Sequence, residues 1–336
     1  MKIYVAPMEG ITGYIFRNAL SQIFKEGIDK FYTPFLVPCE KRALSAKERA
    51  EVLPENNMGI NVVPQILTID ANDFTRIKSE LRELGYTEVN LNLGCPSRTV
   101  TSKGRGAGAL ADTDALDRLL DGIFSMPDAE ISIKTRIGTE DPSEFEKIME
   151  VYRKYPIKEL IVHPRTLCQQ YGGKPYIDTF ISECFDKPCI EKITDDRKNE
   201  MSSSRSIMKI CYNGDICSAT DYEKIVSIVE EKTGKTKNAN MLHAVMIGRG
   251  ILKNPGLIRE ITTGVAATNE EIGKFLDILV IEYSRLFSGE RPVLFKMKEI
   301  WSYLRVRYPE CDKEIKKLIK CKSLAEYKVL QKAILR

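Results

Sequence analysis

The 336-residue chain lacks several features that would assign it to other classes of protein. No apolar run reaches the roughly 18 residues that a membrane-spanning helix needs, so no membrane partner is expected. The first residues lack the apolar stretch and cleavage site of a signal peptide, which favours a cytoplasmic protein. The nine cysteines show no regular spacing and no Cys-x-x-Cys pair. We therefore expect reduced thiols, no disulfide framework and no metal site.

Two nucleotide-binding motifs are also missing. No G-x-G-x-x-G follows the first predicted strand, which argues against a Rossmann domain. The glycine-rich stretch Gly104 to Gly108 does not end in Gly-Lys-Ser/Thr, so it is not a P-loop. We interpret its glycines as giving the backbone conformational freedom beside the thiol of Cys95.

Short β-rich runs alternate with longer amphipathic stretches, a pattern typical of a parallel sheet covered by helices. Helical periodicity occupies the intervals, for instance at 73–84 and 113–124. Eight strands over about 255 residues fit an α/β TIM barrel better than an open doubly wound sheet. The predicted strands are Ile3–Ala6, Lys30–Thr33, Asn61–Ile66, Glu88–Leu93, Glu130–Lys134, Glu159–Val162, Met208–Tyr212 and Ala244–Ile247.

The breaker cluster Asn254-Pro255-Gly256 ends the predicted barrel. We therefore divide the chain into a barrel domain, 1–255, and a small C-terminal helical-bundle domain, 256–336. Asn269-Glu-Glu and Ser323-Leu-Ala-Glu326 are typical of helix starts, the second as a capping box. The predicted helices of the bundle are 270–287, 292–308, 312–320 and 323–335.

The charge of the chain is unevenly distributed. Residues 291–336 hold 13 Lys and Arg against 5 Asp and Glu, a net of +8, which leaves −4 for the rest of a chain whose total is +4. A basic end on a slightly acidic body suggests a polyanionic partner, although a solvated helical surface would carry the same charges. Two polar segments, 194–206 and 230–240, are expected to be exposed loops or helix ends, and we assign no function to the first.

Functional residues of a TIM barrel lie directly after its strands, at the carboxyl-terminal rim. Taken singly, such residues could be structural: Lys134 could reach out of a barrel layer, His163 could be a satisfied core histidine, and Gln65 could cap a strand. Here, however, unusual polar residues follow seven predicted strands, which indicates a site. In strand order the candidates are Pro7 and Met8; Gln65; Asn92 and Cys95; Lys134 and Arg136; His163; Asn213, Gly214 and Asp215; Gly248 and Arg249.

Cys95 is the most informative of these candidates. It lies between a glycine and a proline just beyond a buried strand, so its backbone is held rigidly at the rim. An isolated cysteine would more often be a small buried apolar residue. The seven polar clusters reverse that preference and make Cys95 a functional residue.

Glycine-containing turns follow the last two strands and could hold a phosphate with their backbone N–H groups. Arg249 could add positive charge there. If the ligand is a flavin, a cation such as Lys134 would stabilise the reduced ring, and Gln65 and Asn213 could serve its amide edges. The residues alone do not distinguish a flavin from another phosphorylated ligand.

Several motifs occur in order between residues 4 and 255. They are Ala6-Pro-Met-Glu-Gly-Ile-Thr12, Asn92-Leu-Gly-Cys-Pro96, Gly106-Ala-Gly-Ala-Leu110, Lys134-Thr-Arg-Ile-Gly138, His163-Pro-Arg-Thr166, Asn213-Gly-Asp-Ile216 and Gly248-Arg-Gly250. This set resembles the tRNA-dihydrouridine synthases, the FMN-dependent family of bacterial type. Gly13 and Pro164 depart from the family pattern, which often has Asp and Gly at these two places.

The resemblance implies an FMN-bound barrel that reduces uridine in tRNA, with NADPH as the reductant. Hydride would pass from the flavin to C6 of the uracil, and Cys95 would donate a proton to C5. Asn92 and Arg136 match positions that hold the uracil. The remaining candidates would surround the cofactor: Pro7, Met8, Gln65, Lys134, His163, Asn213, Gly214, Asp215, Gly248 and Arg249.

A proton donor must be neutral before it acts, so the resemblance favours an ordinary or raised pKa for the thiol of Cys95. The helical domain would help to clamp tRNA, and we expect a monomer. Two other functions compete: an FMN-dependent barrel oxidoreductase acting on a free pyrimidine, similar to dihydroorotate dehydrogenase, and an RNA-binding or folding factor without catalysis. The sequence does not determine which uridine is modified, or whether NADPH is preferred to NADH.

Overall fold

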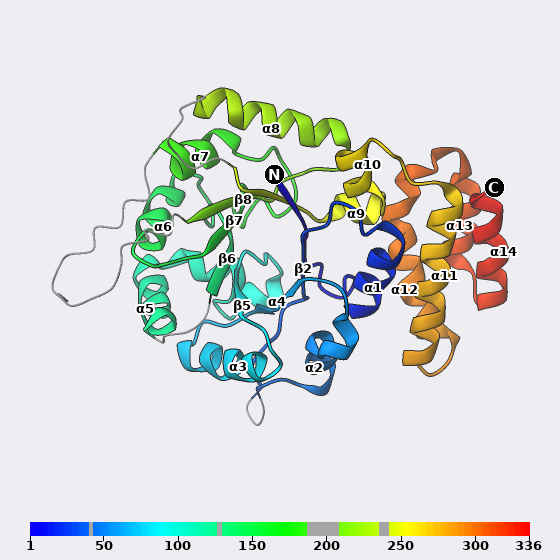
Figure 1. Ribbon diagram of the computed structural model, residues 1–336, viewed down its shortest axis with the longest axis horizontal. Helices are drawn as coiled ribbons and strands as arrows, with labels where there is room; N and C mark the ends of the chain where they lie inside the picture. Colours follow the sequence, from blue (N-terminus) through cyan, green and yellow to red (C-terminus); the bar gives the residue numbers. More distant parts are fainter. Residues whose placement is uncertain (40–42, 126–129, 187–207, 235–241) are drawn as a thin grey trace.

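The computed structural model describes residues 1–39, 43–125, 130–186, 208–234 and 242–336 (Figure 1). One sheet of parallel strands lies at its centre, in the order β3-β2-β1-β9-β8-β7-β6-β5-β4. The strands are β1 (Lys2–Val5), β2 (Lys30–Tyr32), β3 (Val62–Val63), β4 (Gln65–Ile66), β5 (Glu88–Leu93), β6 (Glu130–Arg136), β7 (Glu159–His163), β8 (Lys209–Tyr212) and β9 (Ala244–Ile247).

The two ends of this sheet meet at Pro64. β3 pairs with β2 and β4 pairs with β5, so the one strand predicted at 61–66 is two short strands. Proline has no N–H to donate to a neighbouring strand, which explains the break. The hydroxyl of Thr33 helps to bridge it by accepting a hydrogen bond from the backbone N–H of Gln65 at 3.0 Å. The sheet thus closes into a ring, which confirms the predicted TIM barrel.

Helices surround the barrel (Figure 1), and some of them begin at side chains that cap their free N–H groups. Asp70 caps α3 and Asp112 caps α5. The helical elements up to residue 263 are α1 (Tyr14–Phe24), α2 (Ala46–Val52), η1 (Pro54–Asn57), α3 (Ala71–Glu83), α4 (Arg98–Thr101), η2 (Gly106–Ala111), α5 (Thr113–Phe124), α6 (Glu144–Tyr152), α7 (Ile177–Ile181), η3 (Ser182–Asp186), α8 (Ala219–Thr233), α9 (Arg249–Lys253) and α10 (Leu257–Thr263).

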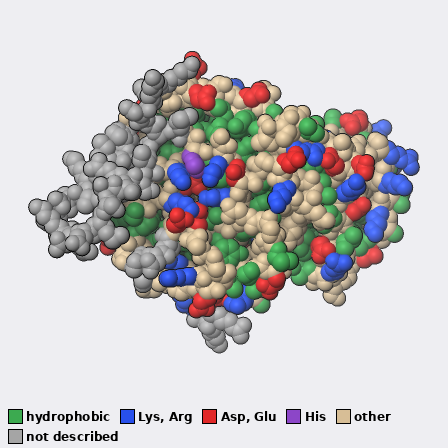
Figure 2. Space-filling model, in the orientation of Figure 1, with side chains coloured by type: hydrophobic (Ala, Val, Ile, Leu, Met, Phe, Trp, Pro, Cys, Tyr) green, Lys and Arg blue, Asp and Glu red, His purple; other side chains and the backbone are tan. Residues whose placement is uncertain are grey.

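The last helices form a bundle at one side of the barrel, where Lys and Arg side chains are frequent on the surface (Figures 1 and 2). Its first helix packs against α1, with the ring of Phe275 5.5 Å from that of Phe16 and 6.2 Å from that of Phe24. Lys296 donates a hydrogen bond to the carbonyl oxygen of Gly10 at the barrel rim. The elements are α11 (Asn269–Leu286), α12 (Glu290–Leu304), η4 (Arg305–Arg307), η5 (Pro309–Cys311), α13 (Asp312–Lys320) and α14 (Leu324–Ile334).

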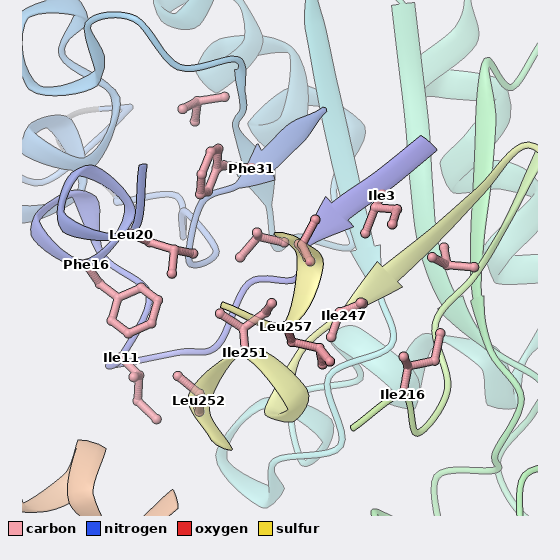
Figure 3. Packing of buried hydrophobic residues seen from close by; sticks show 14 of the residues in the cluster. Ile3, Ile11, Phe16, Leu20, Phe31, Ile216, Ile247, Ile251, Leu252 and Leu257 are labelled. Carbon is pink, nitrogen blue, oxygen red and sulfur yellow. The ribbon is translucent and has the colours of Figure 1, made fainter. Parts of the chain in front are cut away.

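Side chains alternate across each strand, which separates an apolar outer layer from the barrel interior. The interior holds polar side chains and a smaller apolar cluster that includes Tyr4, Ile161 and Met246. On β5, Val89, Leu91 and Leu93 join the apolar core between barrel and helices. Asn90 and Asn92, the residues between them, are also buried. Figure 3 shows the outer core beside β1 and β9, where side chains from the surrounding helices and loops gather.

Most of the predicted elements are confirmed, with shifts at their ends. α5 and α13 have the predicted bounds, whereas α3 begins two residues early because Asp70 caps it. The capping box predicted at Ser323 is only half formed: Ser323 accepts from the N–H of Glu326, but the Glu326 carboxylate accepts from the N–H of Lys322. A complete capping box begins α11 instead, between Thr268 and Glu271.

The predicted polar segment 194–206 lies outside the described residues. Of the segment 230–240, residues 230–233 form the end of α8, Gly234 follows as its C-cap, and the rest lies outside the described residues. Across the described ranges, every helix is too short or too polar to cross a membrane.

We predict that Phe275→Ala destabilises the protein by about 3–5 kcal/mol, because the ring fills the junction between α11 and α1. Urea unfolding measures the loss. Phe295→Ala is the matched control, since the Phe295 side chain is 69% exposed and its removal should change stability by about 0.5 kcal/mol or less. Equal losses in the two variants would contradict this role for Phe275.

Candidate active site

A cavity of about 700 Å³ opens at the carboxyl-terminal ends of the strands. Every residue that the sequence nominated for the site lines it, because parallel strands bring their ends to one rim and alternate residues face inward. These lining residues are Pro7, Met8, Gln65, Asn92, Cys95, Lys134, Arg136, His163, Asn213, Gly214, Asp215, Gly248 and Arg249.

Cys95 is held from two sides. Its N–H donates to the side-chain oxygen of Asn92 at 3.0 Å, and its carbonyl oxygen accepts from the N–H of Ala107 at 3.0 Å. Gly106, with φ of +59°, packs directly on it: a Cβ there would lie 2.7 Å from the Cys95 carbonyl oxygen. Burial raises the pKa of the Cys95 thiol above its usual value, although Lys134 and Arg136 nearby oppose the shift. The thiol is therefore neutral at physiological pH.

Asn92 and Gln65 hold each other inside the barrel. The Asn92 side-chain oxygen also accepts from the N–H of Gly94 at 3.1 Å, and its Nδ2 donates to Gln65 Oε1 at 2.7 Å. Gln65 Nε2 donates in turn to Asn90 at 2.8 Å. Each amide keeps one N–H free of the contacts just named, so a bound ligand could still be recognised by either.

Lys134 is the unusual charge of the cavity. It forms no ion pair with any residue that the structure describes. Burial lowers its pKa to about 8, and the nearby guanidinium of Arg136 adds to the effect. An ammonium without a partner in a buried site is costly unless a ligand supplies the opposite charge.

Two arginines lie close to the ring of Tyr171. The guanidinium of Arg136 is 5.4 Å from the ring centre, and that of Arg249 is 4.8 Å from it. Arg136 also donates to the carbonyl oxygens of Gly94 at 3.0 Å and Thr166 at 2.8 Å, so its orientation is set by the backbone. Burial lowers the Arg136 pKa to about 10, and it remains charged at neutral pH.

Asp215 joins two strand ends through a pair of arginines. Its carboxylate accepts from Arg165 at 2.5 Å and from Arg249 at 2.6 Å. Arg165 also donates to His163 Nε2 at 3.1 Å. Because arginine can only donate, His163 Nε2 must accept, and the neutral ring carries its proton on Nδ1. Burial and the surrounding arginines keep the pKa of His163 well below its usual value, which favours the same neutral form.

The turns after β8 and β9 present backbone donors to the cavity. Within the described ranges, the N–H groups of Gly214, Asp215, Gly248 and Arg249 donate to no protein acceptor. Asn213, directly after β8, is bonded to β9, since its Nδ2 donates to the carbonyl oxygen of Met246 at 2.8 Å. These turns could therefore bind an anion, with Arg249 beside them.

Several lining residues were not nominated from the sequence. Tyr171 lies in the loop between β7 and α7, beyond the strand end, so the strand-end rule did not reach it. Arg165 closely follows β7 and contacts His163 and Asp215 but does not itself line the cavity. Glu299 and Tyr303 also line the cavity but come from α12 in the bundle, and no local pattern indicates that. In the parts of the chain that are described, no group of three or more His, Cys, Asp or Glu side chains could hold a metal ion.

Comparisons with known proteins agree on one family. The model of the family described as "Dihydrouridine synthase (Dus)" matches residues 4–288. The "tRNA-dihydrouridine(16) synthase" of Shewanella oneidensis is 27% identical over 345 residues, covering 99% of this chain and 98% of that protein. The protein of the same name from Escherichia coli K12 is 27% identical over 326 residues, covering 92% and 91%. "tRNA-dihydrouridine synthase B" of Pasteurella multocida is 25% identical over 259 residues, covering 77% and 68%.

We predict that Gly106→Ala lowers the stability of the protein by more than the positive φ of Gly106 alone explains. The new Cβ would collide with the Cys95 backbone in addition to straining a positive φ. Gly59→Ala is the matched control, since Gly59 has φ of +75° and no atom within 4 Å of the position that a Cβ would occupy. We expect about 1–2 kcal/mol of destabilisation for Gly59→Ala and clearly more for Gly106→Ala in urea unfolding. Equal losses of stability in the two variants would show that the contact between Gly106 and Cys95 does not restrict residue 106 to glycine.

We predict that Lys134→Met stabilises the ligand-free protein at pH 7. Because folding lowers the pKa of Lys134 from 10.5 to about 8, its charged form is disfavoured in the folded state. At about 1.4 kcal/mol per pKa unit, the gain should be roughly 1–3 kcal/mol. The gain should be complete below pH 8 and disappear as the pH rises toward 10.5, where lysine is neutral in both states. The measurement is thermal unfolding of wild type and Lys134→Met from about pH 6 to about pH 10, a range that spans the shifted pKa.

Lys30→Met is the control for this prediction. Lys30 is buried at the other end of the barrel and pairs with Glu88 at 3.0 Å and with Glu159 at 3.3 Å. Its removal leaves two buried carboxylates with less compensation and should cost about 3–5 kcal/mol. A comparable loss in Lys134→Met would show that Lys134 has a protein partner after all.

Proposed function

The chain belongs to the dihydrouridine synthase family, and from this membership we propose that it reduces the C5–C6 double bond of a uridine in tRNA, using FMN and NADPH. The observation that carries the proposal is that a neutral acid and an unpaired cation line the same cavity. A neutral thiol, Cys95, and an unpaired ammonium, Lys134, both line it. The thiol suits a proton donor, and the ammonium suits an anionic ligand.

The cavity fits a flavin mononucleotide in three respects. Lys134 could hold the electron-rich edge of the ring, because its charge lacks a partner among the described residues. The donors after β8 and β9, with Arg249, could hold the phosphate. Gln65 could bind an amide edge of the ring through its remaining N–H. FMN held there and reduced by NADPH would supply the hydride for C6 of the uracil.

The role of Cys95 follows from its protonation state. Negative charge that develops at C5 and O4 of the uracil must be quenched by a positioned acid. The raised pKa keeps the proton on the Cys95 sulfur until that moment. The thiolate that remains lies near Lys134 and Arg136, whose charges stabilise it. Cys95 therefore acts as a general acid and not as a nucleophile.

Asn92 and Arg136 would hold the uracil. Asn92 retains one amide N–H beyond its bond to Gln65, which could donate to a pyrimidine carbonyl. The guanidinium of Arg136 is held by two backbone carbonyls and lies over the ring of Tyr171, so its orientation is set before a substrate binds. A preoriented donor loses little freedom on binding, which favours both affinity and alignment.

The substrate uridine must leave the folded RNA to reach this cavity, at an unstacking cost of a few kcal/mol. Phosphate contacts from the basic bundle could offset that cost. Lys313, Lys317 and Lys320 on α13 are exposed, and residues 291–336 carry a net +8. Binding to tRNA should accordingly weaken steeply with salt.

The relatives that match this chain along nearly its whole length are named for position 16 of tRNA. Uridine 16 is therefore the first position to examine here. Dihydrouridine mapping of tRNA from a strain without the protein would identify the position directly.

The test of the proposal is a single-turnover reaction of the FMN-reconstituted, prereduced protein. We expect undermodified tRNA to reoxidise the flavin much faster than free uridine or orotate does. Cys95→Ala should slow formation of dihydrouridine by about 10²–10⁴-fold, the contribution of a positioned general acid. Flavin content and tRNA affinity should be unchanged, because Cys95 is not their anchor.

Cys168→Ala is the matched control, since Cys168 is an exposed thiol that does not line the cavity. Its rate should equal that of the wild type. Equally fast reoxidation by a free pyrimidine would favour a metabolic dehydrogenase over an RNA-modifying enzyme. Full activity of Cys95→Ala would remove the thiol from the mechanism, and RNA binding without any reduction would favour a noncatalytic RNA factor.

A further inference from the structure

A chain of buried side chains crosses the inside of the barrel, from the Cys95 loop to the opposite end. It begins where the Asn92 side-chain oxygen accepts from the N–H groups of Gly94 and Cys95. Asn92 donates to Gln65 at 2.7 Å, and Gln65 donates to Asn90 at 2.8 Å. Asn90 and Gln65 are fully buried, so water cannot replace either partner.

The chain continues to a carboxylate at the amino-terminal end of the barrel. Asn90 Nδ2 donates to Ser132 Oγ at 2.9 Å. The Ser132 hydroxyl lies 3.3 Å from Glu88 Oε1 and 3.4 Å from the carbonyl oxygen of Val89, and it can donate to either. Glu88 is anchored by Lys30 at 3.0 Å and by Lys158 at 2.5 Å.

The direction of every bond in this chain is determined by its ends. An ionised carboxylate and a carbonyl can only accept, so Ser132 must donate to them and accept from Asn90. Asn90 then presents its oxygen to Gln65, and Gln65 presents its oxygen to Asn92. Asn92 is left with its oxygen facing the Cys95 backbone, which agrees with the two N–H groups found there. Both ends demand the same amide orientations.

These links cannot serve as a proton path to Cys95. Side-chain amides hold their protons at neutral pH, and the chain reaches the backbone N–H of Cys95 but not its sulfur. The links can, however, fix positions, because a fully satisfied buried network is rigid.

Resting on the function proposed above, we propose that Asn90 and Ser132 are positioning residues for the reduction: through Gln65 and Asn92 they hold the Cys95 loop at the rim. Neither lines the cavity. Their removal should loosen the loop, which exposes the half-buried thiol and misplaces its proton. An acid displaced by about 1 Å can lose roughly 10²-fold in rate.

The experiment compares Ser132→Ala and Asn90→Leu with Tyr4→Phe in the full-length protein. Tyr4 is the matched control because its buried hydroxyl donates to Glu159 at 2.9 Å, at the same end of the barrel but off the chain that leads to Cys95. Two rates are measured: alkylation of Cys95 by iodoacetamide, followed by peptide mapping, and single-turnover reduction of tRNA.

We expect both chain variants to alkylate at least about fivefold faster and to reduce tRNA at least about tenfold more slowly than wild type, with KM for tRNA unchanged. Tyr4→Phe should leave both rates within about twofold even if its melting temperature falls as far, since a general loss of stability does not select the Cys95 loop. If Asn90→Leu does not fold, the smaller change Ser132→Ala carries the comparison.

Asn90→Asp gives an independent reading. A protonated carboxyl at position 90 has one acceptor oxygen and one donor O–H, as the amide has, whereas the ionised form cannot donate to Ser132. The reduction rate of this variant, relative to wild type, should therefore recover as the pH falls.

Rates in Ser132→Ala and Asn90→Leu that match those of Tyr4→Phe, or no pH dependence in Asn90→Asp, would overturn the positioning role. A wild-type protein that does not reduce tRNA would overturn the proposed function instead. The alkylation rates would still report on the Cys95 loop in that case, so the two failures are distinguishable.

Discussion

Closing a parallel sheet into a barrel removes water from its interior, and each polar side chain inside must then find its partner within the protein. This chain places charges and amides there, and nearly all of them are satisfied by one another. Lys30 is balanced by Glu88 and Glu159, and the amides above them form a directed series that ends at the Cys95 backbone. Among the described residues, Lys134 is an interior charge without an ion pair, which is why it indicates a ligand.

The same constraint explains how the reactive group at the rim is held. The thiol of Cys95 is neutral because it is partly buried, and it is immobile because its backbone is bonded to Asn92 and Ala107. The ion pairs at the amino-terminal end of the barrel and the Cys95 loop at the rim are thus joined through Ser132 and Asn90, which do not line the cavity.

The bundle contributes to the site as well as to the surface charge. Phe275 packs α11 against α1, and Lys296 bonds to Gly10 in the loop that precedes α1. This arrangement brings Glu299 and Tyr303 of α12 to the cavity. A residue pattern confined to the barrel could not reveal them, because their position depends on how two distant segments pack.

The sequence by itself determined the barrel class, the strands and the set of residues at the rim, because strand alternation and parallel ordering are local properties repeated along the chain. Its motifs also indicated the family. Only the tertiary structure decided where the barrel closes, at Pro64, and which polar groups satisfy one another. It also showed that Lys30 pairs with two carboxylates, whereas Lys134 lines the cavity without an ion pair among the described residues. Such pairings join residues far apart in the chain, so they exist only once the barrel has closed.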